Sequence, residues 1–316
     1  MDWRLLCLAI FGLLGACKHA SQPARVTQVS PYVVDEVVGR GPLSARVVQN
    51  DADLLLYVAG EQDGVVGPCD CSAVPKGAMA QLVSYRKAMD KASPVPGLLV
   101  NPGAYFQANT GPVSLMTNKV MLDGLGYASW DALNVTATDL SFLQTQPNHG
   151  LALVSANFIA GNGLSIPKAI EKNVGGNAVL ITGVSRPTVV SDRFSDPLTA
   201  LQDVLRPISA QTFVVVLTHG LGDTIPALMK VPGVDLIIDA DAHVGHWPGV
   251  LEDGVLWVRS RASGVSLREI RLDLANGDLT HGLLRTISMD EEITGDKRLT
   301  ELARSLQEKL DAVLAQ

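Results

Sequence analysis

Two apolar runs that each lead to a histidine constrain the fold of this chain more than any other feature. They lie within residues 213–244, FVVVLTHGLGDTIPALMKVPGVDLIIDADAHV. The first run ends at His219, and the second continues through an acidic segment to His243. Continuous apolar runs of this length are typical of strands that are buried on both faces. The stretch therefore predicts an open α/β sheet, whose sites lie at the carboxyl ends of the strands.

Further short apolar runs along the chain are each followed by a polar turn. Strands are predicted at residues 53–59, 97–100, 132–135, 151–156 and 178–182, and helices at residues 76–91, 115–125, from 139, 196–205 and 298–314. Gly126 is predicted to end the second of these helices. Residues 254–259 and 265–274 are predicted to pair as a hairpin. This alternation predicts a layered α/β sheet.

We expect the turns that follow these strands to meet at one edge of the sheet. They contain Glu61, Asn101, Thr136, Asn157, His219 and Asp241. With 316 residues, of which 47% are hydrophobic, the chain is long enough for one large core. Its formal net charge of -7, without a basic stripe, argues against a nucleic-acid polymer as partner.

The N-terminus has the layout of a bacterial lipoprotein signal. Arg4 precedes an apolar run at residues 5–14 that is too short to span a bilayer, and Leu-Gly-Ala-Cys17 follows. We expect residues 1–16 to be the signal peptide, Cys17 to be lipidated, residues 17–49 to form a tether and an N-terminal wrap, and residues 50–316 to form the domain. The alternative is an ordinary secretory signal with a cysteine at its cleavage site. Lys18, in place of aspartate, favours the outer membrane, facing the periplasm.

Two other cysteines lie close together in the predicted domain. Cys69 and Cys71 occur in Pro-Cys-Asp-Cys, and export would place them in an oxidising compartment. Such a pair can form a strained disulfide, act in redox chemistry, bind a soft metal or cap a loop. No histidine or third cysteine is near in sequence, so a structural or weakly redox-active pair is favoured over zinc.

Two acidic residues follow the first predicted strand. Glu61 and Asp63 are two positions apart, so in an extended or turning segment both side chains can approach one ion. The alternative is a solvated acidic loop.

From about Asp53 to its end, the chain resembles the catalytic domain of calcineurin-like metallophosphoesterases of the 5′-nucleotidase type. Residues 54–71, 97–106, 127–142 and 214–243 match best. The resemblance implies a single-domain α/β/β/α sandwich with a two-metal site on five loops, in which the metals clamp a phosphate and activate water. The resemblance does not include the family's separate C-terminal substrate-specificity domain.

The five loop motifs of that family are changed here at most positions. Asp-x-His aligns with Glu61-Gln62-Asp63, and Gly-Asp aligns with Gly103-Ala104, which lacks the bridging carboxylate. Gly-Asn-His-Asp/Glu aligns with residues 136–139, which place Thr138 where the histidine stands. A histidine that acts as general acid contributes typically about 10²–10⁴-fold in rate. The resemblance therefore implies that a two-metal nucleotidase reaction is lost, and no catalytic residue is assigned.

The last two motifs are better kept. The lone histidine aligns with His219, and Gly-His-x-His aligns with residues 240–243, where Asp241 replaces one histidine and His243 keeps the other. A single divalent ion, Zn²⁺ or Mn²⁺, could use the remaining donors, which suit such ions. These donors are Glu61, Asp63, His219, Asp241 and His243. The alternative is that all are solvated remnants of an ancestral site.

Two hypotheses about function follow from the resemblance. The first is a pseudoenzyme, anchored to the membrane by its lipid, that binds a small phosphorylated ligand or a protein partner. The second is a residual metal-dependent phosphoester hydrolase with a rebuilt single-metal site. Metal content and hydrolysis distinguish them.

Overall fold

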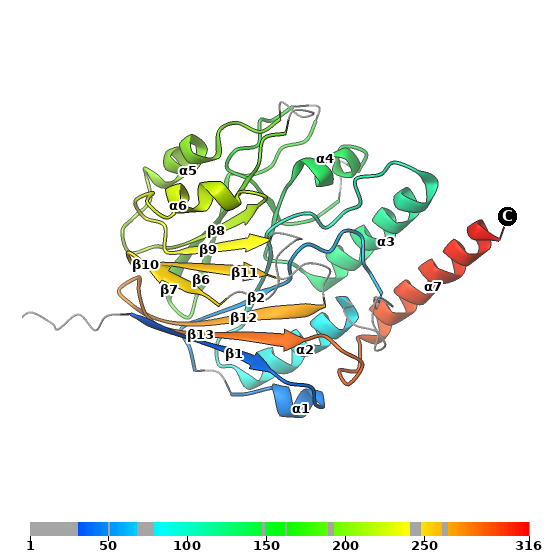
Figure 1. Ribbon diagram of the computed structural model, residues 1–316, viewed down its shortest axis with the longest axis horizontal. Coiled ribbons are helices and arrows are strands. Elements are labelled where there is room, and N and C mark those ends of the chain that lie inside the picture. The colour runs from blue at the N-terminus through cyan, green and yellow to red at the C-terminus, as the bar shows by residue number, and fades with distance from the viewer. Residues whose placement is uncertain are drawn as a thin grey trace, which may run out of the picture. The chain divides into compact units, whose positions relative to one another are not determined.

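Two β-sheets flanked by helices make up the compact unit that begins at Pro31 (Figure 1). The computed structural model describes residues 31–49, 51–67, 79–146, 149–161, 163–188, 193–240, 248–260 and 265–315. Within these residues, no helix combines the length and the apolar character that crossing a membrane requires.

The first sheet contains the strands that open and close the domain. Its order is β1 (Tyr32–Val38), β13 (Asp278–Ser288), β12 (Ser266–Ala275), β2 (Leu54–Val58), β3 (Leu98–Asn101), β4 (Ala132–Asn134) and β5 (Leu153–Val154). β2 to β5 run parallel to one another, whereas β12 is antiparallel to both β2 and β13. Strands β2, β3 and β4 therefore end at the same edge of this sheet.

The second sheet contains the stretch with two apolar runs. Its order is β10 (Val250–Glu252), β11 (Val255–Ser260), β9 (Leu236–Ala240), β8 (Phe213–His219), β7 (Asn177–Ser185) and β6 (Ala169–Val174). The four central strands are parallel, and β10 and β6 pair antiparallel at the two edges. His219 is therefore the last residue of a central strand.

Helices cover the outer faces of both sheets. They are α1 (Leu43–Arg46), α2 (Met79–Ala92), α3 (Pro112–Ala128), α4 (Ala137–Leu143), α5 (Pro197–Leu205), the short 3₁₀ helix at Gly222–Thr224, α6 (Ile225–Leu228) and α7 (Lys297–Leu314). Figure 1 shows α2, α3 and α7 on the side of the first sheet, and α5 and α6 on the side of the second.

Alternation along single strands explains the layers. In β2, Leu55 and Tyr57 pack with the helices, whereas Leu54, Leu56 and Val58 pack against the second sheet. Successive side chains of a strand point to opposite faces, so an entirely apolar strand contributes to two cores. β8 is built in the same way, with alternate residues in the inter-sheet core and under α5 and α6. The predicted α/β/β/α sandwich is confirmed.

Two local predictions were wrong. Residues 254–259 and 265–274 do not form a hairpin, because β11 pairs with β9 in the second sheet and β12 pairs with β2 and β13 in the first. Gly126 does not end its helix, since α3 continues to Ala128. A Cβ at Gly126 would meet no atom within 4 Å, so this glycine sits in open space, and Ser129 ends the helix with a left-handed φ of 54°.

Candidate functional site

The carboxyl ends of strands from both sheets meet at one place. Glu61, after β2, and His219, at the end of β8, approach to 3.4 Å between Oε1 and Nε2. The turn after β3 also lies there, since a Cβ on Gly103 would be 2.4 Å from Cγ2 of Thr136 and 3.5 Å from Cβ of His219. The strand-end turns at Glu61, Thr136 and His219 thus lie together, as their positions after parallel strands predict.

Glu61 and His219 form a partly buried pair. Their side chains are 17% and 22% exposed, and the second carboxylate oxygen of Glu61 is buried without a hydrogen-bond partner in the described part of the chain. Burial alone lowers the pKa of His219, but the hydrogen bond to Glu61 and the negative charges of Glu61, Asp139 and Asp239 outweigh it and raise this pKa. The carboxylate of Glu61 therefore stabilises the charged form of the His219 imidazole relative to the neutral form.

The turn after Glu61 is fixed by backbone hydrogen bonds to the next strand-end turn. The amides of Gln62 and Asp63 donate to the carbonyl of Ala104 at 3.1 and 3.0 Å. Gln62 is only 2% exposed, whereas Asp63 is exposed and has a left-handed φ of 42°. Partial desolvation of the Asp63 carboxyl, and then the charge of Glu61, raise its pKa. The two acids are near enough to interact, as their spacing predicts.

Ala104 stands where the resemblance places a bridging carboxylate. It is 4% exposed and has a φ of 57°. Its amide donates to Asp139, and its carbonyl accepts from the turn at Gln62. A buried methyl group at this position offers no ligand to any cation, so the site has no bridging group from this turn.

Asp139 is occupied by structural hydrogen bonds. The fully buried carboxylate accepts from five donors, namely the amides of Ala104, Tyr105, Phe106 and Thr136 and the hydroxyl of Thr136. Thr136 in turn caps α4, and the two residues form a capping box. Burial raises the pKa of Asp139, and the hydrogen bonds from Thr136, Phe106 and Ala104 oppose that shift. Asp139 therefore holds the turn after β3 against the start of α4.

Three buried asparagines, to which the family's loop motifs give no role, support the same edge. Asn134 Nδ2 donates to Pro102 O at 2.7 Å and to Ser185 Oγ at 3.1 Å, so it joins the two sheets. Asn157 Nδ2 donates to the carbonyl of Ser185 at 2.8 Å, and Asn101 Oδ1 accepts from the amide of Gly103 at 2.8 Å. Each asparagine lies at or just beyond the end of an apolar strand, and this position in the sequence could have indicated a place at the shared edge.

No three Asp, Glu, His or Cys side chains gather as a metal site among the residues that the structure describes. Glu61 and His219 are the pair brought together there, with Asp63 beside them. Asp241 and His243, like Cys17, Cys69 and Cys71, lie outside the described residues, so the single-metal site stays a prediction.

Comparisons with known proteins support the fold. No protein-family model matches the chain, and no curated protein matches its sequence. Solved structures are similar, however, among them a 5′-nucleotidase precursor from Thermus thermophilus, with 19% identity, a TM-score of 0.69, and coverage of 83% of this chain and 60% of that one.

Two further structures agree. The sulfate thiohydrolase SoxB of Thermus thermophilus is 15% identical, with a TM-score of 0.68 and coverage of 82% of this chain and 61% of that one. A 5′-nucleotidase from Candida albicans is 13% identical, with a TM-score of 0.63 and coverage of 82% and 59%. This chain spans about three fifths of the length of these proteins. The likenesses show that it has the calcineurin-like metallophosphoesterase fold.

Proposed function

We propose that this chain is an exported lipoprotein that uses the metallophosphoesterase fold for binding or assembly, without two-metal hydrolysis. One observation supports the proposal: Ala104, where the resemblance places the bridging carboxylate, is buried and hydrogen-bonded through both its amide and its carbonyl. The partner in this proposal is a small phosphorylated ligand or a protein at the envelope. The lipid on Cys17 would anchor the chain in the outer membrane, facing the periplasm.

Electrostatics explain why the Ala104 position matters. Metal ions in two-metal sites stand about 3.5–4 Å apart and clamp the attacking and leaving oxygens together. Two dipositive ions at that separation repel strongly, and a bridging carboxylate offsets the repulsion by contacting both. A methyl group contributes no charge and no lone pair. Asp139 cannot replace it, because both of its oxygens already accept backbone hydrogen bonds.

Glu61 favours a second candidate function, residual single-metal hydrolysis. One of its carboxylate oxygens is buried without a hydrogen-bond partner in the described residues, and the other lies 3.4 Å from His219. A Zn²⁺ or Mn²⁺ ion bound by Glu61, Asp63, His219, Asp241 and His243 would satisfy that oxygen. When bound, such an ion would supply Lewis acidity and an activated water.

Metal analysis and hydrolysis of one preparation distinguish the two functions. The full chain is purified in detergent and incubated with Zn²⁺ or Mn²⁺. After removal of free ions, metal per chain and bis(p-nitrophenyl) phosphate turnover are measured. The first proposal predicts no stoichiometric metal and no turnover. One bound ion and turnover that are both lost in His219→Ala, but kept in Asp123→Asn on the exposed face of α3, would establish the residual hydrolase instead.

Ala104→Asp tests the assignment of the bridging position. Aspartate is among the residues that tolerate a left-handed conformation, so the backbone at φ 57° can accept it. We expect this variant to bind divalent metal more tightly than the parent chain. Equal metal binding by both proteins would contradict the assignment of Ala104.

A further inference from the structure

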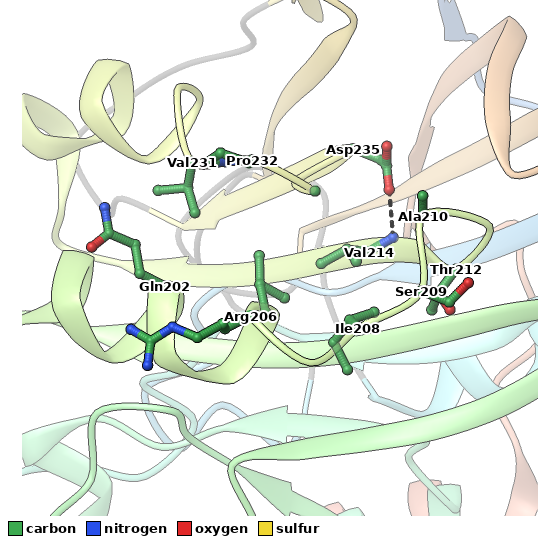
Figure 2. Close-up of a pocket in the computed structure, with 12 residues that line it drawn as sticks. Gln202, Arg206, Ile208, Ser209, Ala210, Thr212, Val214, Val231, Pro232 and Asp235 are labelled. Carbon is green, nitrogen blue, oxygen red and sulfur yellow. Dashed lines mark hydrogen bonds between the residues drawn. The ribbon is translucent and has the colours of Figure 1, made fainter. Parts of the chain in front are cut away.

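A cavity of about 530 Å³ lies at the opposite edge of the second sheet from Glu61 and His219. It is bounded by the end of α5, the loop at residues 206–212, the start of β8 and the loop at residues 231–235 (Figure 2). Val214 lies in its wall, and His219 is five residues further along the same strand, roughly 17 Å away. The cavity is therefore separate from the candidate site.

Apolar and polar side chains both line the cavity. The apolar ones are Leu205, Ile208, Ala210, Val214, Val231 and Pro232, and the polar ones are Gln202, Arg206, Ser209, Thr212 and Asp235. A volume of about 530 Å³ lies within the range of about 300–1,000 Å³ that is usual for small-molecule sites. Such sites combine apolar walls with few polar groups that orient the ligand. Here the polar groups include one carboxylate.

Asp235 is that carboxylate, and it lacks a cationic partner. It is half-buried, and its Oδ2 accepts from the amide of Val214 at 2.7 Å (Figure 2). Its Oδ1 forms no hydrogen bond with the cavity residues that Figure 2 draws. No lysine, arginine or histidine in the described part of the chain forms an ion pair with it. Arg206, which also lines the cavity, is exposed and pairs with Asp203 at 2.8 Å.

The surroundings of Asp235 add negative charge. The turn before β13 lies against the cavity loop, since a Cβ at Gly277 would be 2.7 Å from the carbonyl of Gln211. Burial, and then the charge of Asp278, raise the pKa of Asp235 to about 6, although the amide of Val214 lowers it. The carboxyl end of α5 also contributes partial negative charge. A desolvated carboxylate with this environment is costly until a cation approaches it.

We propose that this cavity binds a small organic cation, an amine carried on an apolar body, whose charge pairs with the free oxygen of Asp235. The apolar body would lie against Leu205, Val214 and Val231. Asp235 accepts a hydrogen bond from the amide of Val214, but an asparagine oxygen could accept the same bond without a partly buried charge. A cationic ligand would account for a carboxylate, rather than an amide, at this position. This inference is independent of the function proposed for the other edge.

Binding of 2-phenylethylammonium to the full chain in a fixed non-ionic detergent tests the proposal. Saturation-transfer NMR measures its affinity, and neutral 2-phenylethanol serves as the isosteric control that reports partition into micelles. We expect the ammonium to bind at least about tenfold more tightly than the alcohol. We also expect Asp235→Asn to remove that preference, because asparagine carries no charge that would distinguish the ammonium from the alcohol.

Two further variants complete the test. Ala210→Phe adds bulk at an exposed wall position and is expected to weaken ammonium binding even if Asp235→Asn fails to fold. Asp123→Asn removes one exposed carboxylate on α3, on the far sheet, and is expected to leave binding unchanged. Absence of ammonium binding, or equal affinities for ammonium and alcohol, would overturn the proposal. So would equal ammonium binding by the parent chain, Asp235→Asn and Ala210→Phe.

Discussion

Replacing Asp139 by asparagine should reveal how much of the strand-end architecture depends on one carboxylate. Its Oδ1 accepts from the amides of Tyr105 and Phe106, both at 3.0 Å. Its Oδ2 accepts from the amides of Ala104 and Thr136 at 3.0 and 3.1 Å, and from the Thr136 hydroxyl at 2.7 Å. Asparagine keeps the shape of the side chain but replaces one acceptor by an NH₂ donor. In either orientation, that NH₂ group faces two backbone N–H donors.

The magnitude follows from those two amides. Each buried N–H left without an acceptor costs about 1–3 kcal/mol. Asparagine also removes the cost of burying a charge, which offsets part of the loss. We therefore expect Asp139→Asn to lower the free energy of unfolding by about 3 kcal/mol. For a unit that extends from Pro31 to Gln316, that corresponds to a fall in Tm of roughly 5 °C.

Urea unfolding followed by circular dichroism measures this effect. The midpoint should fall while the slope of the transition stays unchanged, because the surface exposed on unfolding is the same. Asp123→Asn, an exposed aspartate on α3, is the matched control and should stay within about 0.5 kcal/mol of the parent chain. If Asp139→Asn lay within about 1 kcal/mol of the parent, the view that this carboxylate holds the turn after β3 would be refuted.

Two further predictions concern other parts of the chain. The folded pKa of Asp235, about 6, exceeds its ordinary value of 3.8, so its stabilising contribution is complete below about pH 3.8 and is lost as the pH rises through 6. Relative to Asp235→Asn, the parent chain should lose up to about 3 kcal/mol in its free energy of unfolding between pH 4 and pH 7, measured by urea titration at each pH. A stability difference between the two proteins that does not change with pH would contradict this prediction. Cys17→Ser should abolish incorporation of labelled palmitate in a bacterial host, whereas Cys7→Ser, within the predicted signal peptide, should retain it. Equal labelling of both variants would exclude Cys17 as the lipid site.

The sequence determined the layers of this fold because they depend on local patterns. Successive side chains of a strand point to opposite faces of the sheet, so a strand in which every residue is apolar needs apolar neighbours on both faces. The apolar runs of β2 and β8 therefore predict strands that are buried on both sides. The carboxyl ends of parallel strands share an edge, so the meeting of Glu61 with His219 was predictable in outline. Asp196, directly before a proline, also marked the start of α5 correctly.

Only the tertiary structure decided which groups are partners. β11 and β12 are neighbours in sequence, yet they join different sheets, because long-range pairing and burial override proximity along the chain. The role of Asp139 shows the same limit. Its position three residues after Thr136 is a local capping signal, but its bonds to residues 104–106 join turns more than thirty residues apart. A local pattern specifies which face of an element is buried, whereas a hydrogen-bond partner is specified only when the chain has closed around it.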